Sequence, residues 1–103
     1  MDKKAKVTII GSTNMDLVAR CSEIPVKGQT VLGNDFFTAP GGKGANQAVA
    51  AAMLGAEVNF VTCVGDDIFG NDLEVSLKSY GVKPDYIRAC ANTSSGVALI
   101  AVD

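Results

Sequence analysis

The sequence predicts an α/β fold with a largely parallel sheet and a small β appendage, and three observations support this prediction. Short apolar runs at residues 7–10 and 58–64 are rich in β-branched residues, as buried strands are. Apolar patterns typical of helices occur at 46–54 and 71–80. Because strands and helices alternate along the chain, they favour a parallel sheet connected by crossover helices.

The first part of the chain is expected to contain strands joined by irregular segments. Residues 7–10 end at Gly11 and are predicted to form a buried strand. Residues 17–21 predict a second, more exposed strand, and residues 30–39 are expected to be extended again. Three glycines and a proline at 40–44 predict a loop, because these residues interrupt regular structure.

The second part of the chain is expected to alternate helices and strands. Residues 46–54 are mostly small and apolar and are followed by Gly55, which predicts a helix buried on most of its sides. An amphipathic helix is predicted at 71–80. Strands are predicted at 86–90 and 97–102, separated by a polar turn.

The composition narrows the possible classes of function. The 11 acidic and 9 basic residues give a formal net charge of -2 without a basic stripe, which argues against nucleic acid as a partner. No apolar run approaches the ~20 residues of a membrane span, so no membrane contact is expected. The sequence has no histidine, which excludes Ser-His-Asp chemistry within it. A cytoplasmic location is expected, with the nucleus as an alternative.

The three cysteines indicate neither a metal site nor a disulfide framework. Cys21, Cys63 and Cys90 are odd in number and widely spaced. They are expected to be reduced and to lie in or near the core.

Two polar residues follow the first predicted strand, where open α/β sheets bind their ligands. Asn14 and Asp16 carry an amide and a carboxylate two residues apart. Together these groups can donate to and accept from the neighbouring hydroxyls of a polyol. The alternative is a local turn stabilised by Asn14, with Asp16 facing solvent.

A glycine-rich segment at 41–46 precedes the first predicted helix and is a second candidate site. Gly42 and Gly44 allow the backbone to approach a ligand, Lys43 adds a charge, and Asn46 adds an amide. The alternative is a tight turn in which Asn46 caps the helix. The segment matches neither the P-loop pattern nor the dinucleotide-binding pattern, so it predicts no nucleotide site.

Asp66 and Asp67 form the third cluster, after the strand at 58–64. Paired carboxylates bind metals or perform acid–base chemistry, but they also begin helices. The glycine and the two polar residues that follow at 70–72 favour capping and turn formation here.

Taken together, five segments closely resemble the PfkB family of carbohydrate kinases, and its ribokinase branch in particular. The segments are residues 11–16, 41–50, 54–56, 64–67 and 93–100. This resemblance implies a ribokinase-like αβα sandwich with a β-sheet lid that closes over the sugar. The 41–65 span resembles the first signature of that family.

The resemblance also implies how the chain is organised. Residues 1–103 are expected to form the N-terminal part of one ribokinase-like domain, with lid segments near 17–39 and 97–103. The C-terminal ATP-binding and catalytic part is expected to be absent, with truncation after the lid strand at 97–102.

The activity implied by the resemblance is the ATP-dependent phosphorylation of D-ribose to D-ribose 5-phosphate. In the complete enzyme it requires Mg²⁺ and a monovalent cation such as K⁺, and this chain alone is expected to bind neither cation. No catalytic residue and no metal ligand is expected within the chain, which is therefore predicted to be inactive alone. The positions implied to contact the sugar are Asn14, Asp16, Gly42, Lys43, Gly44 and Asn46.

The resemblance further implies a homodimer formed through lid strands in the complete enzyme. Two alternatives remain open. One is a non-catalytic sugar-binding or dimerisation module, and the other is a different sugar or nucleoside kinase of the PfkB family.

Overall fold

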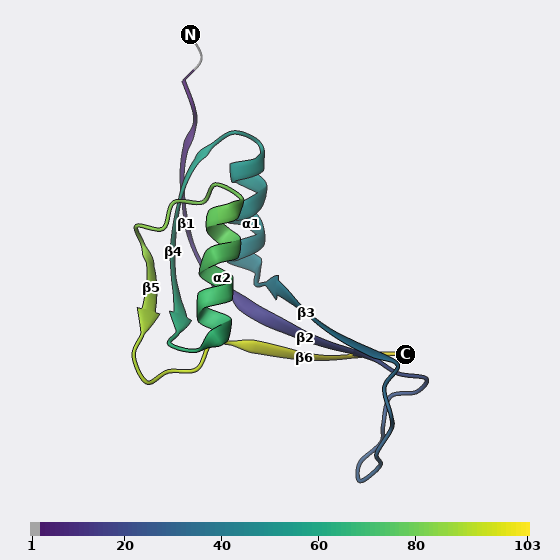
Figure 1. The fold of residues 1–103 in the computed structure, drawn as a ribbon. Coiled ribbons are helices and arrows are strands. Elements are labelled where there is room, and N and C mark those ends of the chain that lie inside the picture. Colours follow the sequence, from purple (N-terminus) through teal and green to yellow (C-terminus); the bar gives the residue numbers. More distant parts are fainter. Residues whose placement is uncertain (1–2) are drawn as a thin grey trace.

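The computed structural model describes residues 3–103 and contains two three-stranded sheets and two helices. Figure 1 shows the upright layer of strands and helices and the second sheet, which projects away from its lower end. In chain order the elements are β1 (Lys6–Ile10), β2 (Asn14–Arg20), β3 (Asp35–Gly41), α1 (Lys43–Met53), β4 (Glu57–Gly65), α2 (Ile68–Ser79), β5 (Ile87–Cys90) and β6 (Val97–Val102).

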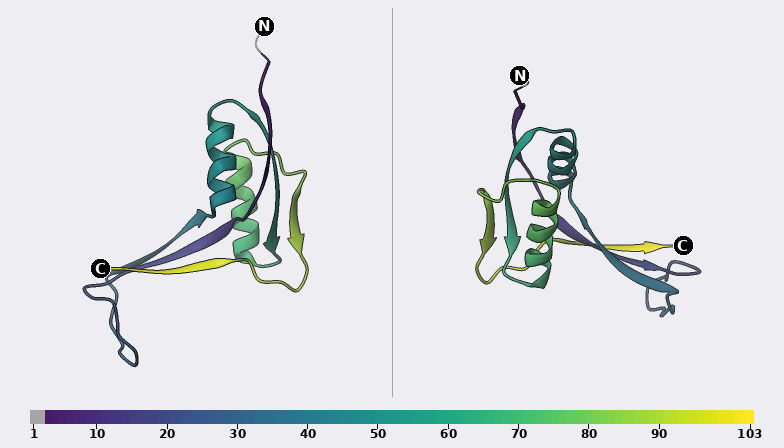
Figure 2. Two further views of the ribbon diagram at one scale, coloured as in Figure 1. Left: turned by 180° about the vertical axis from the view of Figure 1, so that it is seen from behind. Right: turned by 45° about the horizontal axis from the view of Figure 1, so that its top comes forward.

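The upright sheet has the strand order β1-β4-β5 and is entirely parallel, as predicted. Both helices cover the same face of it (Figure 2). Alternate side chains of β4 point toward the helices, and the core is built from them and from the facing residues of α2. The fully buried large side chains are Val58, Phe60 and Leu73.

The other face of this sheet carries no helix within residues 3–103, and this corrects one expectation. The strand at 7–10 was predicted to be buried, but β1 alternates between exposed and half-buried residues. Val7 and Ile9 pack against the core, whereas Ile10 is 79% exposed. A short apolar strand is buried on both sides only when helices cover both faces of its sheet. Here the described residues cover one face.

The first helix begins earlier and is less buried than predicted. It starts at Lys43 rather than at 46, because Pro40 and Gly41 end strand β3 and only Gly42 separates the two elements. The expected loop at 40–44 is therefore wrong. The helix also buries one face only, through Gly44, Ala45 and Ala48, and Met53 near its end is 70% exposed.

The second helix confirms the amphipathic prediction. It buries Leu73 and Leu77, and Gly81 follows its end with a positive φ of 91°. It begins three residues earlier than the predicted 71–80, since Asp67 caps it. Neither helix in the described part of the chain is long and apolar enough to cross a membrane.

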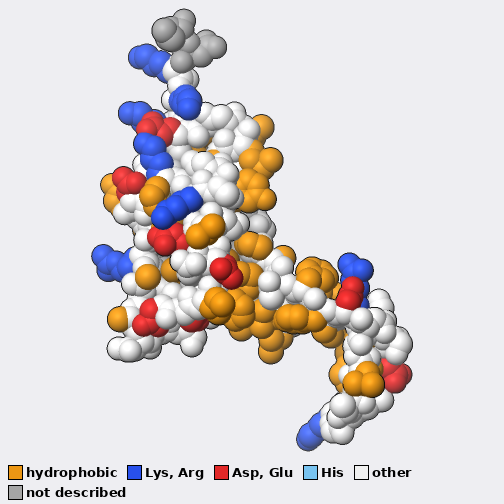
Figure 3. Space-filling view, in the orientation of Figure 1, with side chains coloured by type: hydrophobic (Ala, Val, Ile, Leu, Met, Phe, Trp, Pro, Cys, Tyr) orange, Lys and Arg blue, Asp and Glu red, His pale blue; other side chains and the backbone are white. Residues whose placement is uncertain are grey.

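The projecting sheet, called the lid sheet below, has the order β3-β2-β6. β2 is antiparallel to β3 and parallel to β6, which forms an edge. Strand β6 matches its predicted bounds, whereas β2 begins at Asn14 instead of 17. Apolar side chains gather on this sheet (Figure 3), among them Phe36 and Leu99, which are exposed.

The cysteines follow the prediction only in part. All three are free thiols. Cys21 is buried and its thiol donates to the Val102 carbonyl at 3.6 Å, and Cys90 is half-buried. Cys63 is exposed, because it lies on the uncovered face of β4.

Candidate functional site

The two polar residues predicted after the first strand lie inside strand β2. In the β2–β3 register, Asn14 faces Gly41 and Asp16 faces Ala39. Side chains alternate along a strand, so Asn14 and Asp16 share one face of the lid sheet and Met15 points to the other. Met15 is 3% exposed and belongs to the core. The alternative of a local turn is therefore wrong, and the buried Met15 side chain between the two residues holds them in place.

Asn14 and Asp16 form one polar group. The side-chain amide of Asn14 donates to Oδ1 of Asp16 at 2.9 Å. The Asp16 carboxylate lies against Gly41, where an added Cβ would stand 2.9 Å from either carboxylate oxygen. This bond uses one Asn14 proton and part of the acceptor capacity of Asp16, so both residues retain groups for a hydroxyl ligand.

Gly42 makes the passage from the lid sheet into α1 possible. Its φ of 101° and ψ of 136° lie in a region that residues with a side chain avoid. An added Cβ would also stand 2.6 Å from the Ser12 carbonyl oxygen. The chain can therefore turn into the helix here only because Gly42 has no side chain.

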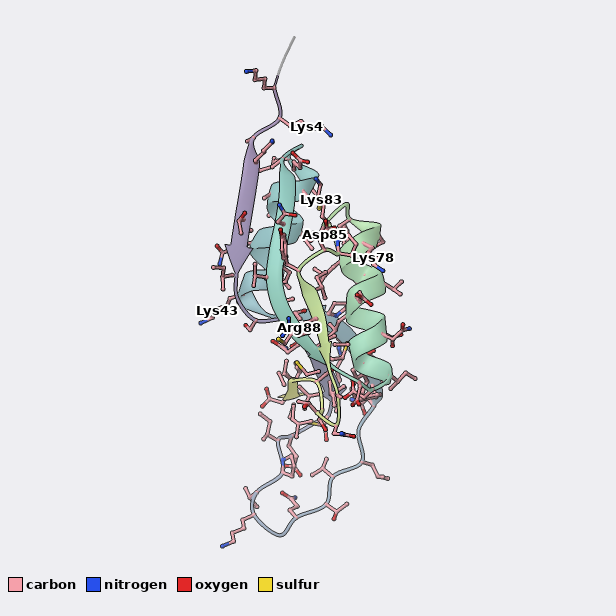
Figure 4. All side chains as sticks on the ribbon, turned by 90° about the vertical axis from the view of Figure 1, so that its left-hand side faces the viewer. Lys4, Lys43, Lys78, Lys83, Asp85 and Arg88 are labelled. Atoms are coloured by element: carbon pink, nitrogen blue, oxygen red, sulfur yellow. The ribbon has the colours of Figure 1, made fainter. Side chains whose placement is uncertain are left out.

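The remaining predicted contacts lie in the first turn of α1. Lys43 and Asn46 are exposed, whereas Gly44 is buried against the backbone of Gly11. Figure 4 shows Lys43 beside the tip of β1, on the opposite side of the molecule from Lys78.

Asn46 does not cap the helix, which corrects the alternative reading of this segment. The amide of Asn46 donates to the Gly42 carbonyl at 2.9 Å, so it already lies within the helix. Its side chain lines a groove between α1 and α2, next to Thr13 and Pro40. The amide of Ala45 donates to the Ser12 carbonyl at 3.0 Å.

Sequence reasoning missed Ser95, which lies where the upright sheet meets the lid sheet. The hydroxyl of Ser95 donates to Asp67 at 2.7 Å and accepts from the Gly65 amide at 2.9 Å. The amide of Ser95 donates to the second Asp67 oxygen at 2.8 Å. The only sequence signal was the polar run at 92–95 before an apolar strand.

Asp67 confirms the capping prediction. It accepts from the Gly70 amide at 2.8 Å, as a helix N-cap does. The Ser95 amide, then the Ser95 hydroxyl and then the Gly70 amide hold the pKa of the Asp67 carboxyl below its usual value, because all three donate to the charged form. Asp66 stabilises the turn at residues 91–92, because its carboxylate accepts a hydrogen bond from the Asn92 amide at 2.6 Å.

We expect an acid-dependent loss of stability from Asp67. A carboxyl whose pKa is lower in the folded than in the unfolded chain stabilises above the unfolded value, and the contribution is lost as the pH falls through the folded value. Urea unfolding followed from about pH 7 to pH 2 should show a steeper loss for the wild type than for Asp67→Asn. Lys83 also lowers the pKa of the Glu57 carboxyl, but this contribution is common to both chains. Parallel curves for the two chains would contradict this assignment.

The described residues do not fit a metal site. Within 3–103, no three side chains of His, Cys, Asp or Glu come close enough together to hold an ion.

Comparisons with known proteins agree with this architecture. Residues 4–103 match the family described as pfkB family carbohydrate kinase. The ribokinase of Bacillus subtilis (strain 168) is 52% identical over 94 residues, which cover 91% of this chain and 32% of the relative. The deoxyribokinase of Salmonella typhi is 43% identical over 97 residues, covering 94% of this chain and 32% of the relative.

A solved structure supports the same assignment. The ribokinase of Arabidopsis thaliana, complexed with ribose and ATP, superposes with a TM-score of 0.86 at 32% identity. The superposition covers 96% of this chain and 32% of the other. The chain therefore has a ribokinase-like α/β fold. The chain belongs to the pfkB family of carbohydrate kinases, and it spans about a third of the length of the curated relatives that it matches.

Proposed function

We propose that this chain is the D-ribose-binding part of an ATP-dependent ribokinase. The observation that carries the proposal is the placement of Asn14 and Asp16 against Gly41, one residue before the lid strand turns into α1. The proposed sugar contacts are Asn14, Asp16, Gly42, Lys43, Gly44 and Asn46. The ribokinase and deoxyribokinase relatives support a pentose as the substrate class.

The groups at this site suit a ligand with several hydroxyls. The Asp16 carboxylate only accepts hydrogen bonds, the Lys43 ammonium only donates them, and Asn14 does both. A sugar hydroxyl also donates and accepts, so neighbouring hydroxyls can pair with these side chains in one orientation. The backbone of Ser12 and Thr13 fills the position of a side chain at Gly42, so this glycine contributes by allowing the chain to turn from β3 into α1 beside Asn14 and Asp16.

The role of this chain in the proposed reaction is to bind and orient D-ribose. Transfer of the ATP γ-phosphoryl group to its 5-hydroxyl, with Mg²⁺ and K⁺, would belong to a complete enzyme about three times this length. The catalytic and ATP-binding groups would lie in the rest of that enzyme, so the chain alone is proposed to be inactive. A cytoplasmic location is part of the same proposal.

Replacing either charged contact is expected to weaken D-ribose binding. Asp16→Ala and Lys43→Ala each remove hydrogen bonds worth about 1–3 kcal/mol, which corresponds to a roughly 5- to 150-fold higher dissociation constant. The measurement is an amide proton–nitrogen NMR titration of residues 1–103 with D-ribose. In the unsubstituted chain, resonances of 14–16 and 41–46 should shift on addition of the sugar.

Two matched variants serve as controls. Asp85→Ala and Lys78→Ala remove the same kinds of charge from residues that lie away from the site (Figure 4), and both should keep the wild-type affinity. A dispersed spectrum that does not respond to D-ribose would reject the proposal. Parallel titration with 2-deoxy-D-ribose separates ribokinase from deoxyribokinase specificity. The sugar with the lower dissociation constant is the preferred substrate.

One observation favours a second role, as a dimerisation module through the lid sheet. Its strands expose large apolar side chains, including Phe36 and Leu99, and β6 forms an edge that pairs with no further strand among residues 3–103. Such surfaces are typical of protein–protein contacts. Sedimentation of the chain tests this role, and a monomer at all concentrations would exclude it.

A further inference from the structure

The lid sheet is joined to the upright sheet by a short segment whose backbone is held at two points. Residues 91–96 connect β5 to β6. Near the start of this segment, Asp66 binds the Asn92 amide, and its own amide donates to the Thr93 carbonyl at 3.1 Å. Near its end, Asp67 binds both the amide and the hydroxyl of Ser95. Both aspartates lie between β4 and α2, so these contacts fix the segment to the upright sheet.

Ser95 lies at the centre of this arrangement. It is 7% exposed, and its hydroxyl both donates to Asp67 and accepts from the Gly65 amide. The end of β4, the start of α2 and the segment before β6 therefore meet at one side chain. A buried hydroxyl with both functions satisfied leaves little freedom for the segment to move.

The same segment leads directly to the proposed sugar contacts. The Gly96 carbonyl accepts from the Met15 amide at 3.0 Å, and Val97 pairs with Met15 in the β2–β6 register. An added Cβ at Gly96 would stand 3.5 Å from the Cβ of Asn14. One peptide unit therefore separates Ser95 from the backbone that carries Asn14 and Asp16.

We infer that Ser95 and Asp67 are positioning residues that fix the lid sheet against the upright sheet and thereby set the affinity for the sugar. This inference rests on the proposed function. The hydrogen bonds among Gly65, Asp67 and Ser95, called the Ser95 latch below, hold β6, and β6 holds β2 through their shared ladder. Neither Ser95 nor Asp67 needs to touch the sugar for its loss to weaken binding.

The test compares two serine substitutions in the full 103-residue chain. Ser95→Ala removes the latch hydroxyl. Ser79→Ala is the control, because the Ser79 hydroxyl also donates a hydrogen bond, to the Ser76 carbonyl at 2.6 Å, but it lies at the far end of α2. We expect Ser95→Ala to raise the D-ribose dissociation constant by roughly two- to thirtyfold. It should also shift the Met15 amide and the Asn14 side-chain amide, whereas Ser79→Ala should change neither.

The outcomes separate the inference from the proposed function. Unchanged affinity and unchanged lid amides in folded Ser95→Ala would overturn the inference while leaving the sugar site intact. A wild-type spectrum that does not change on addition of D-ribose would reject the proposed function. The amide shifts of the lid sheet in the two variants would then still show whether the Ser95 latch fixes that sheet. A wild-type spectrum with poor dispersion would also overturn the inference, because it would show that the Ser95 latch does not hold the two sheets together in this chain.

Amide hydrogen exchange of the unsubstituted chain provides a second measurement if Ser95→Ala does not fold. The inference requires the amides of Gly65, Ser95 and Met15 to exchange through one common opening, because one latch controls all three. Equal free energies of opening support it. A Met15 amide that opens independently of the Ser95 amide would overturn it.

Discussion

Gly65→Ala is expected to destabilise the chain by about 3 kcal/mol, at the upper end of what overpacking costs. A Cβ at this position would overlap the amide nitrogen of Ser95 and the carbonyl oxygen of Thr93. These are backbone atoms of the segment that Asp66 and Asp67 hold in place, so they cannot move aside cheaply. Urea unfolding monitored by circular dichroism measures the loss.

Gly96→Ala is the matched control for this substitution, since it adds the same methyl group to the same junction. Its Cβ would meet the Asn14 Cβ at 3.5 Å, which is ordinary van der Waals contact. We expect a change within about 0.5 kcal/mol. Equal losses for the two variants would show that the crowding at Gly65 is not what constrains this junction.

The sequence was sufficient to predict the elements whose residues carry a strong local pattern. The run at 97–102 and the strand around 58–64 were predicted closely, because β-branched residues between polar or glycine boundaries favour strands. Helix capping and turn formation were predicted for Asp66 and Asp67 from the glycine and polar residues at 70–72, and Asp67 is the N-cap of α2. The predicted α/β fold with a parallel sheet is likewise that of the ribokinase structures.

Elements set by pairing between distant segments were predicted less well. Nothing in the local pattern of residues 14–16 or 40–41 indicates a strand, yet they pair with each other across the sheet. Proline and glycine predicted a loop there, but both are compatible with the end of an edge strand such as β3. Tertiary pairing thus overrode the local preference.

The burial predictions failed for a related reason. The apolar helix α1 and strand β1 were expected to be buried, but only one face of the upright sheet is covered by described residues. An apolar composition indicates that the side chains of a helix or strand tend to be buried. It does not indicate which other segment of the protein packs against them. Ser95 was missed because its two partners are 28 and 30 residues away in sequence.

Gly42→Ala is expected to destabilise the chain more than Gly55→Ala, although both glycines have a positive φ. The φ values are 101° and 97°, so an alanine at either position costs about 1–3 kcal/mol of backbone strain. Nothing lies within 4 Å of a Cβ at Gly55, whereas at Gly42 it would stand 2.6 Å from the Ser12 carbonyl oxygen. That contact adds about 1–3 kcal/mol for Gly42→Ala only.

The comparison also separates stability from binding. Gly42→Ala displaces the start of α1 from the strand that carries Asn14 and Asp16, so D-ribose affinity should fall together with stability. Gly55→Ala lies at the opposite end of α1 and should lower the unfolding midpoint without changing the affinity of the folded fraction. Calorimetric titration with D-ribose at a temperature where both variants are folded distinguishes the two effects. If both variants lose affinity equally, the turn at Gly42 has no special part in holding the sugar site.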